Sequence, residues 1–165
     1  MDYEAVIGLE THCQLKTRSK MFCGCANEFG ADPNTNVCPV CLGMPGVMPV
    51  ANERALQLTA LTGYLLHCEV PSFAKFDRKN YFYPDVCKDY QITQFDFPST
   101  TTGHLDFEFE GDIQRVRITR AHLEEDVGKN NHYSEYSGVD FNRAGVPLLE
   151  IVSEPDIRSA DMAYE

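Results

Sequence analysis

Two close pairs of cysteines in an early loop constrain this 165-residue chain more than any other feature. Cys23 and Cys25 are one residue apart, and Cys38 and Cys41 are two apart, within MFCGCANEFGADPNTNVCPVCLG, residues 21–43. This stretch is rich in Gly, Pro and Asn and poor in apolar residues, so it is not expected to fold around a core of its own. A disulfide knot, a shared zinc ion or a redox pair are the three ways in which the cysteines could act.

A disulfide framework is disfavoured by the cysteine count. The chain has seven cysteines, an odd number, and its start lacks the basic and apolar regions of a secretory signal. The remaining three stand alone in apolar or mixed surroundings, and we expect them to behave as buried small hydrophobes. These three are Cys13, Cys68 and Cys87.

Zinc accounts best for the four clustered cysteines. Zn²⁺ takes four ligands tetrahedrally, and two close pairs across a loop can supply them, although C-x-C is tighter than the usual spacing. A redox C-x-x-C usually opens a helix, whereas Cys38 and Cys41 lie in a loop with Pro39 and Pro45. Four unrelated thiols remain the other alternative. Four thiolates leave no open coordination position, so such an ion would hold the loop rather than activate water.

Composition excludes several classes of protein. The chain is 43% hydrophobic and 24% charged, and no window reaches 18 uninterrupted apolar residues, so we expect a globular protein with no membrane span. We expect a cytoplasmic location, with an organelle as the alternative. The net charge of −11 should repel RNA phosphates, so a nucleic acid would have to meet a local basic patch or another part of the protein. One such patch lies in residues 71–98 and contains Lys75, Arg78, Lys79 and Lys88.

The hydrophobic pattern predicts mostly strands and one long helix. Residues 6–15 and 146–152 read as strands, and residues 105–119 alternate as a hairpin turning at Gly111-Asp112. Residues 52–67 predict a helix capped by Asn52, and Ser159 could cap a second helix. The apolar stripe of the long helix is expected to be Ala55, Leu58, Leu61, Thr62 and Leu65. This order favours an α+β fold with a largely antiparallel sheet. We also expect the last residues, from about Ala160, to be poorly packed in isolation.

Acidic and histidine residues gather at the predicted strand ends. Glu10 and His12 are two apart and point to the same face of a strand. His122 opens the run HLEED, and Glu150 lies in the apolar strand VPLLEIV, where a lone acid is costly unless it is paired or binds a cation. Carboxylate oxygens with an imidazole suit Mg²⁺. A solvated charge run and a structural histidine are the competing interpretations, and both stay open at this point.

Two lysines could act on phosphate. Lys79 and Lys88 flank YFYPD and could offset negative charge on a phosphoryl group or an acyl phosphate. The alternative is that both are exposed and cover aromatic rings with their stems. The chain has no P-loop and no G-x-G-x-x-G, so a nucleotide site would be of another type.

Long blocks of the chain resemble one protein family. The strings VIGLETHCQL, SKMFCGCANEFGADPNTNVCPVCLGMPGVMPVAN, FDRKNYFYPD, HLEEDVGK and VDFNRAGVPLLEIVSEPDIRS are similar to the B subunit of the tRNA-dependent amidotransferases, the GatB family. The resemblance covers residues 1–165 as the front part of one catalytic domain, with residues 21–43 as a zinc loop within it. It implies a glutamine-synthetase-like fold, an antiparallel sheet with helices on one side.

The resemblance also implies a reaction. The family uses ATP and Mg²⁺ to phosphorylate the side-chain carboxylate of Glu or Asp misacylated on tRNA(Gln) or tRNA(Asn). Ammonia, released from glutamine by the A subunit, then displaces the phosphate. The expected partners are the A and C subunits and the misacylated tRNA, which is bound mainly by C-terminal domains beyond this segment. We expect the segment alone to be inactive.

Motif by motif, the resemblance implies three sets of site residues. The Mg²⁺ ligands would be Glu10, His12, Glu124, Glu125 and Glu150, with Glu125 also catalytic. Lys79 and Lys88 would also be catalytic and would bind ATP, lying near its phosphates or the ammonia channel. The structural zinc ligands would be Cys23, Cys25, Cys38 and Cys41. Val86-Cys87 stands where the family pattern has Leu-Pro, which changes the loop before Lys88.

Two alternatives lie outside this function. The chain could be a non-catalytic zinc-loop interaction module, or an ATP-dependent carboxylate–amine ligase that acts without tRNA. Convergence of the acids and His12 on one pocket would favour an enzyme, whereas scattered placement on the surface would favour the module.

Overall fold

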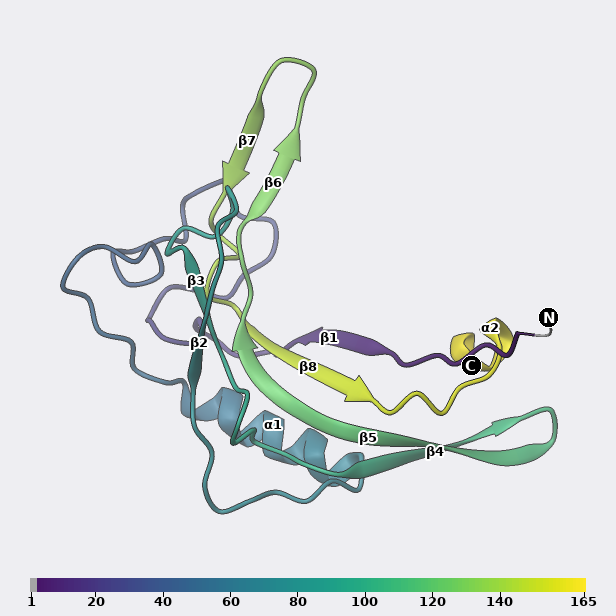
Figure 1. Ribbon diagram of the computed structural model, residues 1–165. Helices are drawn as coiled ribbons and strands as arrows, with labels where there is room; N and C mark the ends of the chain where they lie inside the picture. The colour runs from purple at the N-terminus through teal and green to yellow at the C-terminus, as the bar shows by residue number, and fades with distance from the viewer. Residues whose placement is uncertain (1–2) are drawn as a thin grey trace.

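The computed structural model describes residues 3–165, and it is built mainly from antiparallel strands (Figure 1). In chain order the elements are β1 (Glu10–Gln14), α1 (Glu53–Leu65), β2 (Asp77–Asn80), β3 (Tyr90–Thr93), β4 (Gly103–Phe109), β5 (Asp112–Glu125), β6 (Lys129–His132), β7 (Ser137–Asp140), β8 (Pro147–Ser153) and α2 (Ala160–Tyr164). The α+β class with a mostly antiparallel sheet is therefore confirmed. Within the described range, neither helix has the length and apolar character needed to cross a bilayer. Met1 and Asp2, the first residues of the segment that lacks the features of a signal peptide, lie outside the described residues.

A four-stranded sheet in the order β1-β8-β5-β4 carries the chemistry, and two ribbons, β2–β3 and β6–β7, flank it. In Figure 1, β5 is the long curved strand that runs from the hairpin with β4 toward the β6–β7 ribbon. Strand β8 lies between β1 and β5, so His12, Glu150 and His122 stand directly opposite one another across three strands. The next row of the register, with Leu149 and Leu123, faces the other side of the sheet. One face is therefore polar and the other apolar.

The apolar face forms the core with helix α1. The buried cluster contains Leu15, Met21, Phe22, Ala55, Ala121, Leu123 and Leu149. The predicted cap is confirmed, since the Asn52 side chain accepts a hydrogen bond from the Arg54 amide. The predicted stripe is partly wrong: Leu61 and Leu65 are 53% and 69% exposed.

Helix α1 instead buries small residues. Its buried positions are Ala55, Thr59 and Gly63. Because these side chains are short, the helix backbone can approach β5 closely. An ideal Cβ placed on Gly63 would lie 2.6 Å from Cγ2 of Thr100, a side chain whose hydroxyl bonds both the amide and the carbonyl of Ala121.

We expect Gly63→Ala to destabilise the protein by about 1–3 kcal/mol, because overpacking outweighs the gain in helix propensity. Thermal or urea unfolding measures the change. In a Thr100→Ser background, which removes Cγ2 and keeps the hydroxyl, the same substitution should cost much less. An equal cost in both backgrounds would show that Thr100 is not the obstacle.

The hairpin between β4 and β5 is confirmed, but its turn is shifted by one residue. Phe109 pairs with Asp112, so the two-residue loop is Glu110-Gly111 rather than Gly111-Asp112. Both loop residues have positive φ, 53° and 87°, as a type I′ turn requires. Like the expected turn with Gly first, this type matches the twist of the strands, but it places Glu110 in a left-handed conformation.

Both ends of the described chain lie toward the end of the sheet where the β4–β5 hairpin turns (Figure 1). The first strand is shorter than expected, with only an isolated bridge between Ile7 and Ile157 before it. Ser159 caps α2 by accepting from the Met162 amide, as predicted. Helix α2 buries none of its residues, which agrees with the expected weak packing from Ala160.

Candidate functional site

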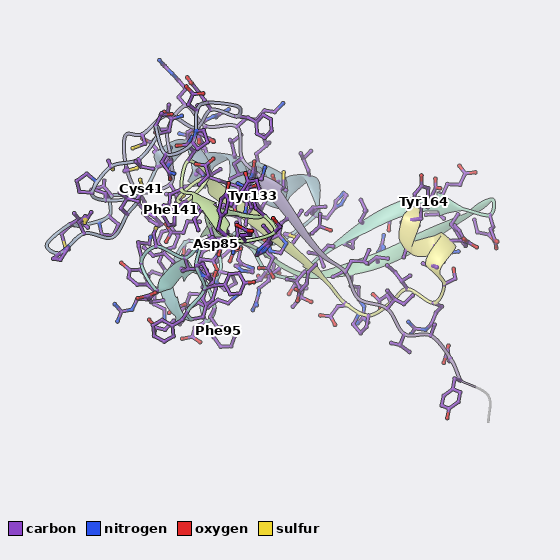
Figure 2. The ribbon with its side chains drawn as sticks, turned by 90° about the horizontal axis from the view of Figure 1, so that it is seen from above. Cys41, Asp85, Phe95, Tyr133, Phe141 and Tyr164 are labelled. Atoms are coloured by element: carbon purple, nitrogen blue, oxygen red, sulfur yellow. The ribbon has the colours of Figure 1, made fainter. Side chains whose placement is uncertain are left out.

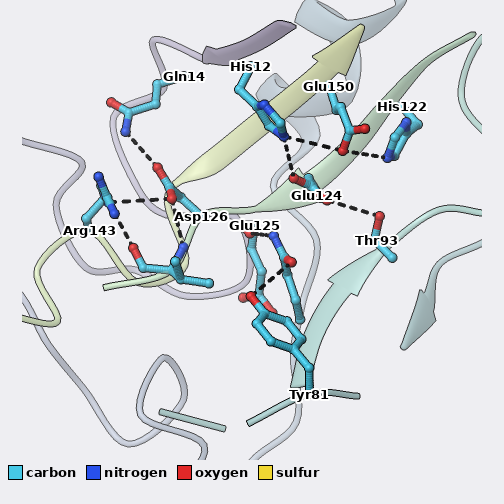
Figure 3. A network of polar contacts seen from close by, with 12 residues as sticks. His12, Gln14, Tyr81, Thr93, His122, Glu124, Glu125, Asp126, Arg143 and Glu150 are labelled. Atoms are coloured by element: carbon cyan, nitrogen blue, oxygen red, sulfur yellow. Dashed lines mark hydrogen bonds and ion pairs between the residues drawn. The ribbon is translucent and has the colours of Figure 1, made fainter. Parts of the chain in front are cut away.

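The polar face of the sheet brings one histidine and two carboxylates together (Figure 3). His12 Nε2 lies 3.6 Å from Glu124 Oε1 and 3.4 Å from Glu150 Oε2. These separations are long for hydrogen bonds. They lie between the cis and trans spacings of ligands around one octahedral ion with bonds of about 2.1 Å, which are about 3.0 and 4.2 Å. One nitrogen and two carboxylate groups with a solvent-facing side fit Mg²⁺ or a similar hard cation.

The carboxylates of Glu124 and Glu150 affect each other's charge. Burial raises the pKa of Glu124 to about 7, and the neighbouring Glu150 carboxylate adds to the rise. The Thr93 hydroxyl donates a hydrogen bond to Glu124 Oε2 at 3.2 Å, and this bond opposes the rise in the pKa of Glu124. Two close carboxylates, one of them buried, are stabilised together by a cation between them. Glu150 is 14% exposed in its side chain, and so is less buried than its apolar neighbours in sequence suggested.

A second histidine lies beside Glu150. His122 is 3% exposed, and its Nε2 lies 3.5 Å from Glu150 Oε2, on the side opposite His12. Burial lowers the pKa of His122 to about 4, with the Arg120 charge contributing, so its ring is neutral at pH 7. Its Nδ1 has no hydrogen-bond partner within the described chain. The sequence showed His122 in the HLEED run, but gave it no role of its own.

An open cavity of about 680 Å³ surrounds this group. Four of the residues expected at the magnesium site line it, together with one of the two expected lysines. They are Glu10, His12, Glu124, Glu150 and Lys79. Glu10 and His12 share one face of β1 as predicted, although they lie at the start of that strand rather than its end. Lys79 is exposed, its Nζ lies 5.6 Å from the Tyr81 ring, and no carboxylate of the described residues pairs with it.

Glu125 and Lys88 lie outside this cavity and form an ion pair with each other. Because Glu124 and Glu125 are adjacent on β5, their side chains point to opposite faces, and Glu125 faces away from His12. Its carboxylate Oε1 accepts from Lys88 Nζ and from the Ile92 amide at 3.0 Å. The two charged side chains are 4% and 10% exposed. The structure thus separates the expected site into a cluster that could hold a cation and a buried ion pair, and separates Lys79 from Lys88.

Several polar residues that the sequence reasoning did not select complete the cavity. Gln14 donates to Asp126 Oδ2 at 2.7 Å, and the Arg143 guanidinium lies 3.5 Å from Asp126 Oδ1. The Tyr81 hydroxyl bonds Gln91, whose amide donates in turn to the backbone carbonyl of Glu125. Gln14 could have been found by continuing the i, i+2 series of Glu10 and His12. Arg143 had no signal, because it arrives from the loop before β8.

The four clustered cysteines meet at a second site. Their Sγ atoms all lie within 4.8 Å of one another, and those of Cys38 and Cys41 are 3.9 Å apart. Tetrahedral zinc with bonds of about 2.3 Å requires sulfurs about 3.8 Å apart, whereas a disulfide requires about 2.05 Å. The Cys38 amide also donates to Cys41 Sγ at 3.2 Å. The cluster can therefore bind zinc, and no described cysteine is in a disulfide.

The three other cysteines differ from one another. Cys68 is buried, as expected, and burial raises its pKa. Cys13 is exposed, so the expectation of a buried hydrophobe is wrong there: β1 is an edge strand of the sheet, and all five of its residues are exposed. Cys87, in the position where the loop departs from the family pattern, donates to the Cys41 carbonyl at 3.0 Å. This bond ties the segment before Lys88 to the cysteine loop.

Comparisons with known proteins agree on one family. Residues 5–165 match the model described as the GatB/GatE catalytic domain. The B subunit of the aspartyl/glutamyl-tRNA(Asn/Gln) amidotransferase of Frankia casuarinae is 57% identical over 170 residues, covering 98% of this chain and 34% of the relative. The corresponding protein of Thermodesulfovibrio yellowstonii is 60% identical over 160 residues, covering 96% and 34%. The chain thus spans about a third of the length of these curated relatives.

Proposed function

The chain belongs to the GatB/GatE catalytic-domain family, and we propose on this basis that it supplies the carboxylate-activating site of a tRNA-dependent amidotransferase. The substrate would be Glu misacylated on tRNA(Gln), or Asp misacylated on tRNA(Asn). ATP and Mg²⁺ would activate its side chain, and ammonia from glutamine would complete the amide. A glutaminase A subunit and a C subunit would be its partners, and regions beyond this segment would carry most of the tRNA contacts.

The chemistry runs in two balanced steps. A side-chain carboxylate oxygen of the misacylated residue attacks the γ-phosphorus of ATP, and the bond to the β-phosphate oxygen breaks, which releases ADP. Ammonia then attacks the carbonyl carbon of the acyl phosphate. The bond from the carbonyl carbon to the phosphate oxygen breaks, inorganic phosphate leaves with one proton from the ammonia, and the product is Gln-tRNA(Gln) or Asn-tRNA(Asn).

The residues around the cavity suit these steps. His12, Glu124 and Glu150 would hold Mg²⁺, which supplies charge neutralisation on the phosphates when bound. Lys79 lies in the same cavity without an acidic partner in the described chain, so its ammonium is free to contact a phosphate oxygen. Arg143 is already held by the carbonyls of Val127 and Gly128, which favours a fixed wall over a mobile phosphate contact.

The observation that carries this proposal is the convergence of His12, Glu124 and Glu150, from three different strands, on one open cavity. The same convergence counts against a module whose acids are merely solvated. Phosphate release from ATP by the complete protein with its partner subunits is the test. We expect release with Glu-tRNA(Gln) or Asp-tRNA(Asn), and little with uncharged tRNA. Equal release without tRNA would instead support a tRNA-independent ligase, and no release with either misacylated tRNA would contradict the proposal.

For the second site, we propose a structural zinc ion bound by Cys23, Cys25, Cys38 and Cys41. Four thiolates fill the tetrahedral shell, so the ion would take no part in amidation. Its role would be to fold a loop that has few apolar residues of its own.

Removing this zinc is expected to loosen residues 23–41 while leaving the cavity around His12 in place. Limited proteolysis of the complete protein, before and after chelation, should show new cuts confined to the loop. Adding zinc back should protect the loop again, and magnesium added in its place should not. A loop that resists protease equally with and without the chelator would refute the structural role.

A further inference from the structure

Lys20 is the most unusual charged residue of the chain, because it is 1% exposed and among the largest fully buried side chains. Lysine is almost never buried to this extent unless its charge is paired. It directly precedes Met21 of the core and lies three residues before Cys23. Neither of the two sites described above accounts for it.

The ammonium of Lys20 has three acceptors and no carboxylate. Its Nζ donates to the Asn36 carbonyl at 2.7 Å, to the Phe141 carbonyl at 3.4 Å and to Cys41 Sγ at 3.5 Å. No Asp or Glu of the described chain forms an ion pair with it. Its three protons are thus satisfied, but the only partner that can carry a negative charge is a cysteine sulfur.

Among the described residues, the only group beside Lys20 that can carry negative charge is the four-cysteine cluster, which its ammonium meets at Cys41 Sγ. A buried ammonium without a negative group beside it costs several kcal/mol. Four thiolates around Zn²⁺ carry −4 plus 2, a net charge of −2, and such a centre gains from a cation beside it. A zinc-loaded loop would therefore place a fixed negative centre beside Lys20.

We propose that Lys20 is the counter-cation of a tetrathiolate zinc centre, acting through Cys41, and that its burial and zinc loading depend on each other. The inference rests on the zinc ion proposed above and not on the amidation reaction. Lys20 is here a positioning residue, because it touches a ligand and not the metal.

The same three bonds join separate parts of the chain. Asn36 lies between the two cysteine pairs, and Phe141 lies in the segment that leads from β7 to β8. Figure 2 shows Cys41 and Phe141 side by side at one end of the molecule, far from Tyr164. Asn142 reinforces the link, since its side chain accepts from the Asn36 amide at 2.8 Å. Loss of zinc should therefore free Lys20 together with this junction.

The first test is the zinc affinity of the complete protein carrying Lys20→Met, which keeps an unbranched side chain one atom shorter and removes the charge. We expect zinc to bind about 10- to 100-fold more weakly, measured by competition with a chromophoric chelator. Lys16→Met is the matched control, because Lys16 is nearby and exposed, and its affinity should stay at the wild-type level. Unchanged affinity in Lys20→Met would overturn the proposal. A wild-type protein that binds no zinc would overturn the zinc centre, and this inference with it.

Unfolding experiments separate this role from simple packing. If Lys20 compensates the charged centre, Lys20→Met should destabilise the zinc-loaded protein more than the zinc-free protein. If Lys20 only fills space, both forms should lose the same stability, and the proposal fails.

A third measurement uses the wild-type protein, so it does not depend on a variant that folds. The amine of Lys20 should resist acetylation in the zinc-loaded protein and react at least tenfold faster after chelation, as read by mass spectrometry. Lys16 should react equally in both states and serves as the internal reference. A Lys20 that stays protected without zinc would contradict the mutual dependence.

Discussion

Glu150→Gln is expected to lower amidation by about 100-fold or more, the loss typical of removing one preorganised electrostatic group from an active site. Glu150 occupies the centre of the row across β1, β8 and β5, with one imidazole at 3.4 Å and another at 3.5 Å. Glutamine keeps the shape of the side chain and removes its charge. The variant should therefore fold and assemble, but bind the cation weakly.

The measurement is amidation of misacylated tRNA by the complete complex, together with Mn²⁺ binding as a readout that does not depend on turnover. Glu108→Gln on β4 is a matched control, because it makes the same charge change outside the cavity. It should retain both properties. Normal Mn²⁺ binding by Glu150→Gln would show that Glu150 is not a ligand, and normal amidation would remove the cluster from the reaction.

Breaking the buried pair of Lys88 and Glu125 is expected to have the second large effect. Glu125→Gln should cost about 3 kcal/mol of folding stability, because Lys88 is then left buried without its countercharge. Glutamine still offers an oxygen to the Ile92 amide, so the loss should report the charge rather than the hydrogen bond. The variant should also amidate more slowly, while assembly with the partner subunits stays intact.

A double-mutant cycle isolates the pair. Lys88→Met and Glu125→Met should each destabilise the protein, and the double variant carrying both should cost clearly less than these two single changes added together. Urea unfolding of all four proteins gives the coupling free energy. Purely additive costs would show that the two charges do not stabilise each other, and an unchanged rate of amidation in Glu125→Gln would remove Glu125 from the reaction.

Part of the candidate site followed from periodicity alone. Glu10 and His12 share a face of β1 because strand side chains alternate, and the same rule places Glu124 and Glu125 on opposite faces. The family resemblance, and not this rule, groups Glu125 with the metal ligands, and the structure places its side chain on the face away from His12 (Figure 3). The apolar stripe of α1 is wrong for a separate reason. Helical periodicity identifies residues that share a face, but the close approach of α1 to β5 selected the face bearing Ala55, Thr59 and Gly63.

Features that depend on near neighbours along the chain could be read from the residues alone. These are the caps at Asn52 and Ser159, the hairpin of β4 and β5, and the two close cysteine pairs of the loop before α1. The meeting of distant residues became visible only in the folded chain. The register of β8 between β1 and β5 brings Glu150 to His12, and the folding of the cysteine loop onto the segment before β8 buries Lys20. Strand register and charge burial are set by contacts between residues far apart in sequence, and no local pattern records them.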